Sequence, residues 1–252
     1  MSKINFLTKQ VPNILTLLNM AAGSVALILA LESNLTASAI LILIAALLDF
    51  ADGMAARLLD AGSALGKQLD SLSDLVSFCV APSVILYFLI SKSMPISENI
   101  PIRFADSLLM LLPVSPVFLI LAGGYRLARF NIKSSTENFY GLPVPASGIF
   151  ISGLALMAAD SPGGFPAVMM HWPWFYFIVI IFLCVLMISS LHLLSLKFAT
   201  FTYRNNQVRY LFLVTSAVLL VVIQESALPL IIITYLLFSL INNLLLKQDK
   251  RT

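Results

Sequence analysis

Four aspartates stand in two pairs within otherwise apolar sequence, and they are the residues of this chain best suited to chemistry. Asp49 and Asp52 are three residues apart, and Asp70 and Asp74 are four apart. On a helix, these spacings put both members of a pair on one face, so each pair can converge on a common point. Two such faces predict a site built from four carboxylates.

That much negative charge in apolar sequence requires compensation, because an ionised carboxylate is costly to remove from water unless it is paired. Oxygen-only ligands of this kind suit Mg²⁺ or Mn²⁺ rather than zinc. We therefore predict a site for two divalent cations, with Asp49, Asp52, Asp70 and Asp74 as its ligands.

The residues between the two pairs are mostly small or able to form hydrogen bonds: Gly53, Ala56, Arg57, Ser63 and Gly66. This composition is typical of a place where a phosphate-bearing ligand approaches the backbone closely. Arg57 can offer a fork of donors to the oxygens of a diphosphate. The stretch therefore predicts phosphoryl chemistry assisted by metal ions.

The composition is that of a membrane protein rather than a soluble one. The 252 residues are 60% hydrophobic and 11% charged, with a mean hydropathy of +0.97. The net charge of +3 is too small and too scattered to indicate nucleic-acid binding. No polar stretch is long enough to form a separate soluble core, so we expect a single integral membrane domain over residues 1–252.

Apolar runs predict an all-α bundle of eight membrane spans, at about 14–31, 36–59, 69–90, 104–127, 145–159, 172–194, 208–223 and 227–246. The first run could instead be a cleaved signal peptide. We favour a retained span, since polar Asn13, Thr16 and Asn19 interrupt the run and no clear cleavage site follows it.

Lysine and arginine predict the orientation, because they stay preferentially on the cytoplasmic side. With a cytoplasmic N-terminus, all but Lys92 and Arg103 of the 15 Lys and Arg residues fall on the inside. We therefore expect a multi-pass protein of a bacterial or archaeal cytoplasmic membrane, with both termini and the aspartates facing the cytoplasm.

Written as a pattern, residues 49–74 read D-x2-D-G-x2-A-R-x8-G-x3-D-x3-D, and this stretch resembles the CDP-alcohol phosphotransferase family of membrane enzymes. Eight specified residues over 26 positions make the signal specific. The resemblance implies a homodimer with a six-span core, here about residues 1–195, in which CDP-diacylglycerol gives its phosphatidyl group to an alcohol and CMP leaves. The spans at about 208–246 exceed that core.

Other segments are similar to the integral-membrane phosphatidylserine synthases within this family: Pro12-Asn13, Thr16, Asn19 and Gly23, then the stretch ending in Phe130-Asn131, then residues 141–146. This likeness implies L-serine as the acceptor and phosphatidylserine as the product. It also implies that the CDP-lipid contacts Gly53, Arg57, Ser63, Gly66, Asn13 and Thr16, and that Arg126, Arg129 and Asn131 lie near the acceptor.

The family resemblance implies Asp74 as the catalytic base. Chemistry supports this role, because the last carboxylate of the array is the one nearest the helix interior and could take the proton of the attacking hydroxyl.

Several alternatives stay open. Glycerol 3-phosphate or an inositol phosphate could be the acceptor, since Arg126 and Arg129 would serve a phosphate as well as a carboxylate. These arginines could also be simple positive-inside anchors. An ion-coupled transporter would use intramembrane aspartates too, but the absence of repeat symmetry argues against it.

Overall fold

The computed structural model describes residues 6–94, 110–132, 141–160, 170–191, 193 and 207–249. Their helical elements are α1 (Phe6–Leu31), α2 (Leu35–Leu58), α3 (Ala64–Leu75), η1 (Val76–Val80), α4 (Ala81–Ser93), η2 (Leu112–Val114), α6 (Val117–Ile132), α7 (Val144–Asp160), α9 (Pro173–Ile188), α10 (Gln207–Ile223), η4 (Gln224–Ser226) and α11 (Ala227–Asp249). Because α3, η1 and α4 are continuous, these residues form eight long helical rods and no strand. The prediction of an all-α bundle is confirmed.

Three of the rods, Gln10–Leu31, Leu35–Leu58 and Ala64–Ser93, are long and apolar enough to cross a membrane. Shorter apolar helices cover Val144–Ala159, Pro173–Ile188, Gln207–Ile223 and Ala227–Ile241. Large apolar side chains also face outward, as at Leu47, which is 70% exposed. An apolar exterior suits contact with lipid, so the chain is a membrane protein.

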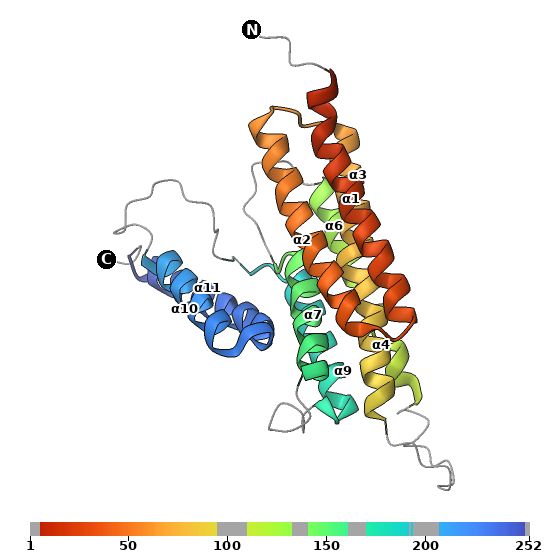
Figure 1. Cartoon of the computed structure of the whole chain (residues 1–252). Helices are drawn as coiled ribbons and strands as arrows, with labels where there is room; N and C mark the ends of the chain where they lie inside the picture. The colour runs from red at the N-terminus through yellow and green to blue at the C-terminus, as the bar shows by residue number, and fades with distance from the viewer. Residues whose placement is uncertain are drawn as a thin grey trace, which may run out of the picture.

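The helices α1 and α2 form the antiparallel hairpin around which one end of the bundle is built (Figure 1). Ser33 adopts a positive φ of 63° in the connecting turn, and the Asn34 side chain then caps α2 by accepting a hydrogen bond from the Ala37 amide. Farther along, the Ser38 hydroxyl donates to the Ala26 carbonyl at 2.7 Å. These contacts fix the register of α2 against α1.

The third rod contains a π-helical turn, η1, directly after the last aspartate of the motif. Three consecutive side chains of this turn each face a glycine of a different helix: Ser77 faces Gly23 of α1, Phe78 faces Gly148 of α7, and Cys79 faces Gly123 of α6. A Cβ at Gly23 would lie 2.6 Å from the Ser77 Cα, which is too close for any side chain. The glycines thus let three helices pack tightly around the segment that carries Asp74.

The fourth predicted span, at 104–127, has different bounds in the structure. The helix α6 begins at Val117, after a 3₁₀ turn with Pro113 and a bend at Pro116, and continues to Ile132. Proline does not fit a helix interior, which explains the late start. The predicted start at Phe104 lies outside the described residues, as does the predicted end of the 172–194 span. Similarly, α3 begins at Ala64 rather than at 69, because Ser63 caps it.

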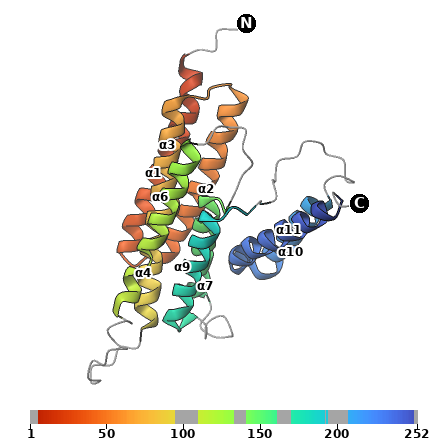
Figure 2. The same ribbon diagram turned by 180° about the vertical axis from the view of Figure 1, so that it is seen from behind.

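The helices α10 and α11 pair with each other and lie obliquely beside the bundle rather than along it (Figures 1 and 2). Their main contact with the bundle is with α7, where Gly153 faces Leu228 and Pro229. The six preceding rods form most of the buried core, including Phe78, Ile151 and Tyr176, and Ile232 and Leu236 of α11 join it. The division into a six-span core and two added spans stays a prediction.

Candidate active site

The four aspartates lie at one end of the bundle, where α2 ends and α3 begins. One carboxylate oxygen from each of Asp49, Asp70 and Asp74 lies within 4.8 Å of the other two. Asp52 is not part of this trio: its Oδ2 accepts a hydrogen bond from the Thr16 hydroxyl of α1 at 2.6 Å. The convergence of the two helical faces is therefore observed for Asp49, Asp70 and Asp74, whereas Asp52 contacts α1.

Burial makes the negative charge of this cluster costly. Asp52 is 5% exposed and Asp74 is 7% exposed. In addition, the buried Asp74 Oδ1 has no hydrogen-bond partner within the described part of the chain. Neighbouring carboxylates repel one another, and burial strengthens that repulsion. The converging oxygens of the three aspartates, together with the unpartnered Asp74 Oδ1, fit the binding of divalent cations such as Mg²⁺ or Mn²⁺.

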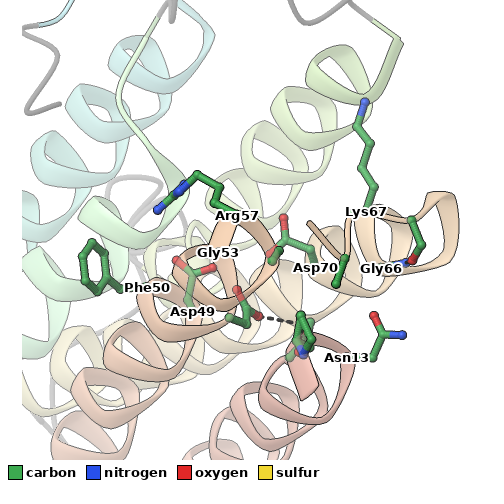
Figure 3. A pocket seen from close by; sticks show the side chains of 15 residues that line it. Asn13, Asp49, Phe50, Gly53, Arg57, Gly66, Lys67 and Asp70 are labelled. Carbon is green, nitrogen blue, oxygen red and sulfur yellow. Dashed lines mark hydrogen bonds between the residues drawn. The ribbon is translucent and has the colours of Figure 1, made fainter. Parts of the chain in front are cut away.

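A pocket of about 450 Å³ opens beside the cluster (Figure 3). Its walls come from the first half of α1, the second half of α2, the connecting loop and the start of α3: Pro12, Asn13, Thr16, Asp49, Phe50, Asp52, Gly53, Ala56, Arg57, Ala61, Gly62, Ser63, Gly66, Lys67 and Asp70. In Figure 3, Lys67 extends away from Asp70, while the Arg57 side chain extends to the side on which Asp49 and Phe50 lie. The pocket therefore has an anionic end and two cationic side chains.

Every residue that the sequence assigned to the CDP-lipid lines this pocket: Asn13, Thr16, Gly53, Arg57, Ser63 and Gly66. A Cβ at Gly66 would lie 2.9 Å from Asn13 Oδ1, so α1 approaches closely there. At Gly53 the nearest atom to an added Cβ is Arg57 Nη1 at 3.9 Å, which means that this glycine leaves space open. Gly66 thus allows close helix packing, whereas Gly53 leaves space for a ligand.

Two of these residues also have structural partners. The Ser63 oxygen accepts a hydrogen bond from the Gly66 amide at 2.9 Å, which makes Ser63 the N-cap of α3. The Thr16 hydroxyl donates to Asp52 as described above. Ser63 keeps its own hydroxyl proton for donation to a ligand, whereas the single proton of Thr16 is used.

The residues assigned to the acceptor lie on α6, and Arg126, Arg129 and Asn131 are absent from the described lining of the pocket. Asn131 Nδ2 donates to the Ser71 hydroxyl at 2.9 Å, which ties α6 to α3. Arg126 Nη2 lies 3.5 Å from the Gly141 carbonyl, while its buried Nε has no partner in the described chain. Their acceptor role stays a prediction.

The sequence reasoning did not nominate Lys67. Its ammonium group lies 3.0 Å from the Asn131 carbonyl oxygen and 5.8 Å from the centre of the Phe130 ring, so it links the pocket to the end of α6. Lys67 directly follows Gly66 of the motif, and this position could have indicated a role in the site. Asn19 was noted only as a polar residue of the first span and as part of a resemblance, yet its side chain is completely buried.

Comparison with known proteins agrees with this architecture. A sequence model of the CDP-alcohol phosphatidyltransferase family matches residues 9–246. The chain therefore belongs to this family, as the motif predicted. Members of the family use divalent cations, which is consistent with the trio of Asp49, Asp70 and Asp74.

Individual relatives are similar over more than half of the chain. The archaetidylserine synthase of Methanothermobacter thermautotrophicus is 36% identical over 58% of this chain. The CDP-diacylglycerol–serine O-phosphatidyltransferases of Mycobacterium leprae and Bacillus subtilis are 34% and 35% identical over 61% and 55% of it. These matches cover 57%, 49% and 71% of the respective relatives, so the chain spans about half the length of the first two.

Proposed function

We propose that this protein transfers the phosphatidyl group of CDP-diacylglycerol to the hydroxyl of L-serine, releasing CMP and forming phosphatidylserine. The observation that carries the proposal is the trio of aspartate oxygens within 4.8 Å beside a pocket lined by Arg57. Three relatives whose names specify a serine product or serine transfer support the choice of acceptor.

Asp49, Asp70 and Asp74 would hold the cations, with Asp52 beside them, oriented by Thr16. When bound, divalent cations would neutralise charge on the diphosphate and on the departing CMP. The aspartates keep these ligand oxygens in place because they stand on rigid helical turns packed against α1, rather than on a loop.

The donor would lie in the pocket, with its diphosphate between the carboxylate end and Arg57. The Arg57 guanidinium can bind two phosphate oxygens at once. Gly53 gives the space for this approach, and Ser63 can donate a hydrogen bond from the loop. Phe50, which lines the pocket and is 65% exposed, would cover apolar parts of the donor.

Asp74 would act as the general base in a direct displacement. The serine oxygen attacks the phosphorus of the phosphatidyl phosphate, the bond from that phosphorus to the CMP oxygen breaks, and the hydroxyl proton passes to Asp74. The unpartnered Asp74 Oδ1 supports this assignment, since it is free to accept that proton. No serine, cysteine or histidine stands beside a base among the pocket residues, so no covalent intermediate is invoked.

The serine carboxylate would be bound by Arg126 and Arg129, with Asn131 nearby. Arg126 and Arg129 are three residues apart and share a face at the end of α6, and Asn131 connects this end to Ser71 of α3. The excess of positive charge at the same end of the bundle supports a cytoplasmic active site, where serine and CMP are soluble. We further propose a homodimer in a bacterial or archaeal cytoplasmic membrane.

A direct test is turnover by the purified protein. CDP-diacylglycerol would be supplied with labelled L-serine, glycerol 3-phosphate or inositol 1-phosphate in separate reactions. We expect a labelled lipid and CMP only with serine. A lipid product with glycerol 3-phosphate and none with serine would overturn the choice of acceptor, while no product with any acceptor would overturn the activity itself.

A further inference from the structure

Asn19 is an unexplained polar residue in the interior of the bundle. Its exposure is 0%, and both polar atoms of its side chain, Oδ1 and Nδ2, lack hydrogen-bond partners within the described part of the chain. Buried polar groups in proteins are almost always paired, because an unpaired buried donor or acceptor is costly. A leucine of similar size would avoid that cost, so the amide requires a functional reason.

The register between α1 and α2 puts Asn19 beside Asp49. These helices run antiparallel, with Thr16 in contact with Asp52 and Ala26 in contact with Ser38. In an antiparallel pair, moving forward along α1 corresponds to moving backward along α2. Asn19 lies three residues after Thr16, and Asp49 lies three residues before Asp52, so both are about 4.5 Å farther along in the same direction.

The contacts with the third rod put Asn19 beside Asp74 as well. The Ser73 hydroxyl donates to the Thr16 carbonyl at 3.2 Å, and the Ser77 hydroxyl donates to the Asn19 carbonyl at 3.1 Å. Asp74 lies between these two serines, and its own Oδ1 is buried and unpartnered. Thr16, one turn before Asn19, contacts α2, and Gly23, one turn after Asn19, faces η1. The Asn19 side chain therefore enters the space between α2 and the third rod.

We propose that Asn19 is a fifth polar group of the carboxylate centre, which positions Asp74 and takes part in binding the divalent cations. A side-chain amide suits this place, since Nδ2 can donate to a carboxylate while Oδ1 supplies an oxygen of the kind that Mg²⁺ and Mn²⁺ bind. It also adds no fifth negative charge to the cluster. This inference rests on the cation-binding role in the proposed function.

The test measures Mn²⁺ affinity of the full-length protein in detergent by following the electron paramagnetic resonance signal of free Mn²⁺. Asn19→Leu should weaken binding by about 10–100-fold, as is typical when a group that orients metal ligands is lost. Its thermal stability in metal-free buffer should stay equal or rise, because two unpaired polar atoms are removed. Ser152→Ala is the matched control, since Ser152 is also fully buried with an unpartnered hydroxyl but lies on α7. It should leave Mn²⁺ affinity unchanged.

Asn19→Asp provides a second measurement should the leucine variant not fold. A fifth carboxylate in the cluster should lower the unfolding temperature without metal, and Mn²⁺ should raise that temperature more than it does for the wild type. Equal Mn²⁺ affinity of wild type and Asn19→Leu, or equal Mn²⁺-induced shifts for wild type and Asn19→Asp, would overturn this inference alone. A wild-type protein that binds no Mn²⁺ would overturn both the inference and the cation role in the proposed function.

Discussion

Arg57 on α2 and Arg126 on α6 both lie at the site end of the bundle, but their surroundings differ. Arg57 is exposed and lines the open pocket. Arg126 is half-buried outside the pocket lining, within electrostatic range of Asp74, and its Nη2 lies at 3.5 Å from the Gly141 carbonyl. The pocket side is thus open to a large ligand, whereas the α6 side is packed. This contrast suits a bulky nucleotide lipid on one side and a small acceptor on the other.

Removal of divalent cations should have the largest effect, because both sides of the site depend on the same carboxylates. We expect EDTA to abolish turnover and Mg²⁺ or Mn²⁺ to restore it, since the buried aspartates alone would repel the diphosphate. Activity assays before and after readdition of the metal check this. Full turnover in metal-free buffer would contradict the role given to the trio.

Asp74→Asn should reduce kcat by roughly 10²–10⁴-fold, because the amide keeps the shape but cannot take a proton. Binding of the CDP-lipid should change less, since Asp74 is outside the pocket lining. Steady-state kinetics with both substrates separates these effects. Near-normal turnover by Asp74→Asn would mean that another group accepts the proton of the serine hydroxyl.

The same assay can test direct displacement. Labelled CMP should not exchange into CDP-diacylglycerol when serine is absent, because no phosphatidyl-enzyme is expected. Exchange in a serine-free preparation would contradict the single-step mechanism.

Arg57→Lys should weaken donor binding by about 1.5–3 kcal/mol, because lysine keeps the charge but loses the fork of donors. The KM for CDP-diacylglycerol should rise, while that for serine should stay nearly constant. Ser63→Ala serves as a comparison that removes the cap of α3 and one proposed hydrogen bond to the donor without changing charge. An unchanged donor KM in a folded Arg57→Lys variant would remove the contact from the proposal.

Arg126→Gln should give the smallest effect, with a loss of about 1 kcal/mol in acceptor binding, because glutamine still offers a hydrogen bond. Here the KM for serine should rise more than that for CDP-diacylglycerol, which is the reverse of the Arg57 result. Equal increases in both values would indicate that Arg126 supports the helix packing rather than the acceptor. The opposite pattern in the two variants would establish the division of the site.

The sequence alone determined the membrane class, the helical architecture and the family. Spacings of three and four residues fixed which carboxylates share a helical face, and this depends only on the geometry of one helix. The motif likewise indicated Gly53, Arg57, Ser63 and Gly66, all of which line the pocket. Local spacing carried this information because α2, the loop and α3 are consecutive in the chain.

Only the tertiary structure decided the roles that depend on contacts between distant segments. Thr16 reaches Asp52 across 36 positions, Asn131 reaches Ser71 across 60, and the π turn is enclosed by glycines from three other helices. The same packing leaves Asn19 completely buried, although nothing in its immediate sequence distinguishes it from other polar residues of an apolar helix. Helix periodicity assigns a residue to a face, but the partner of that face is set by how the helices pack together.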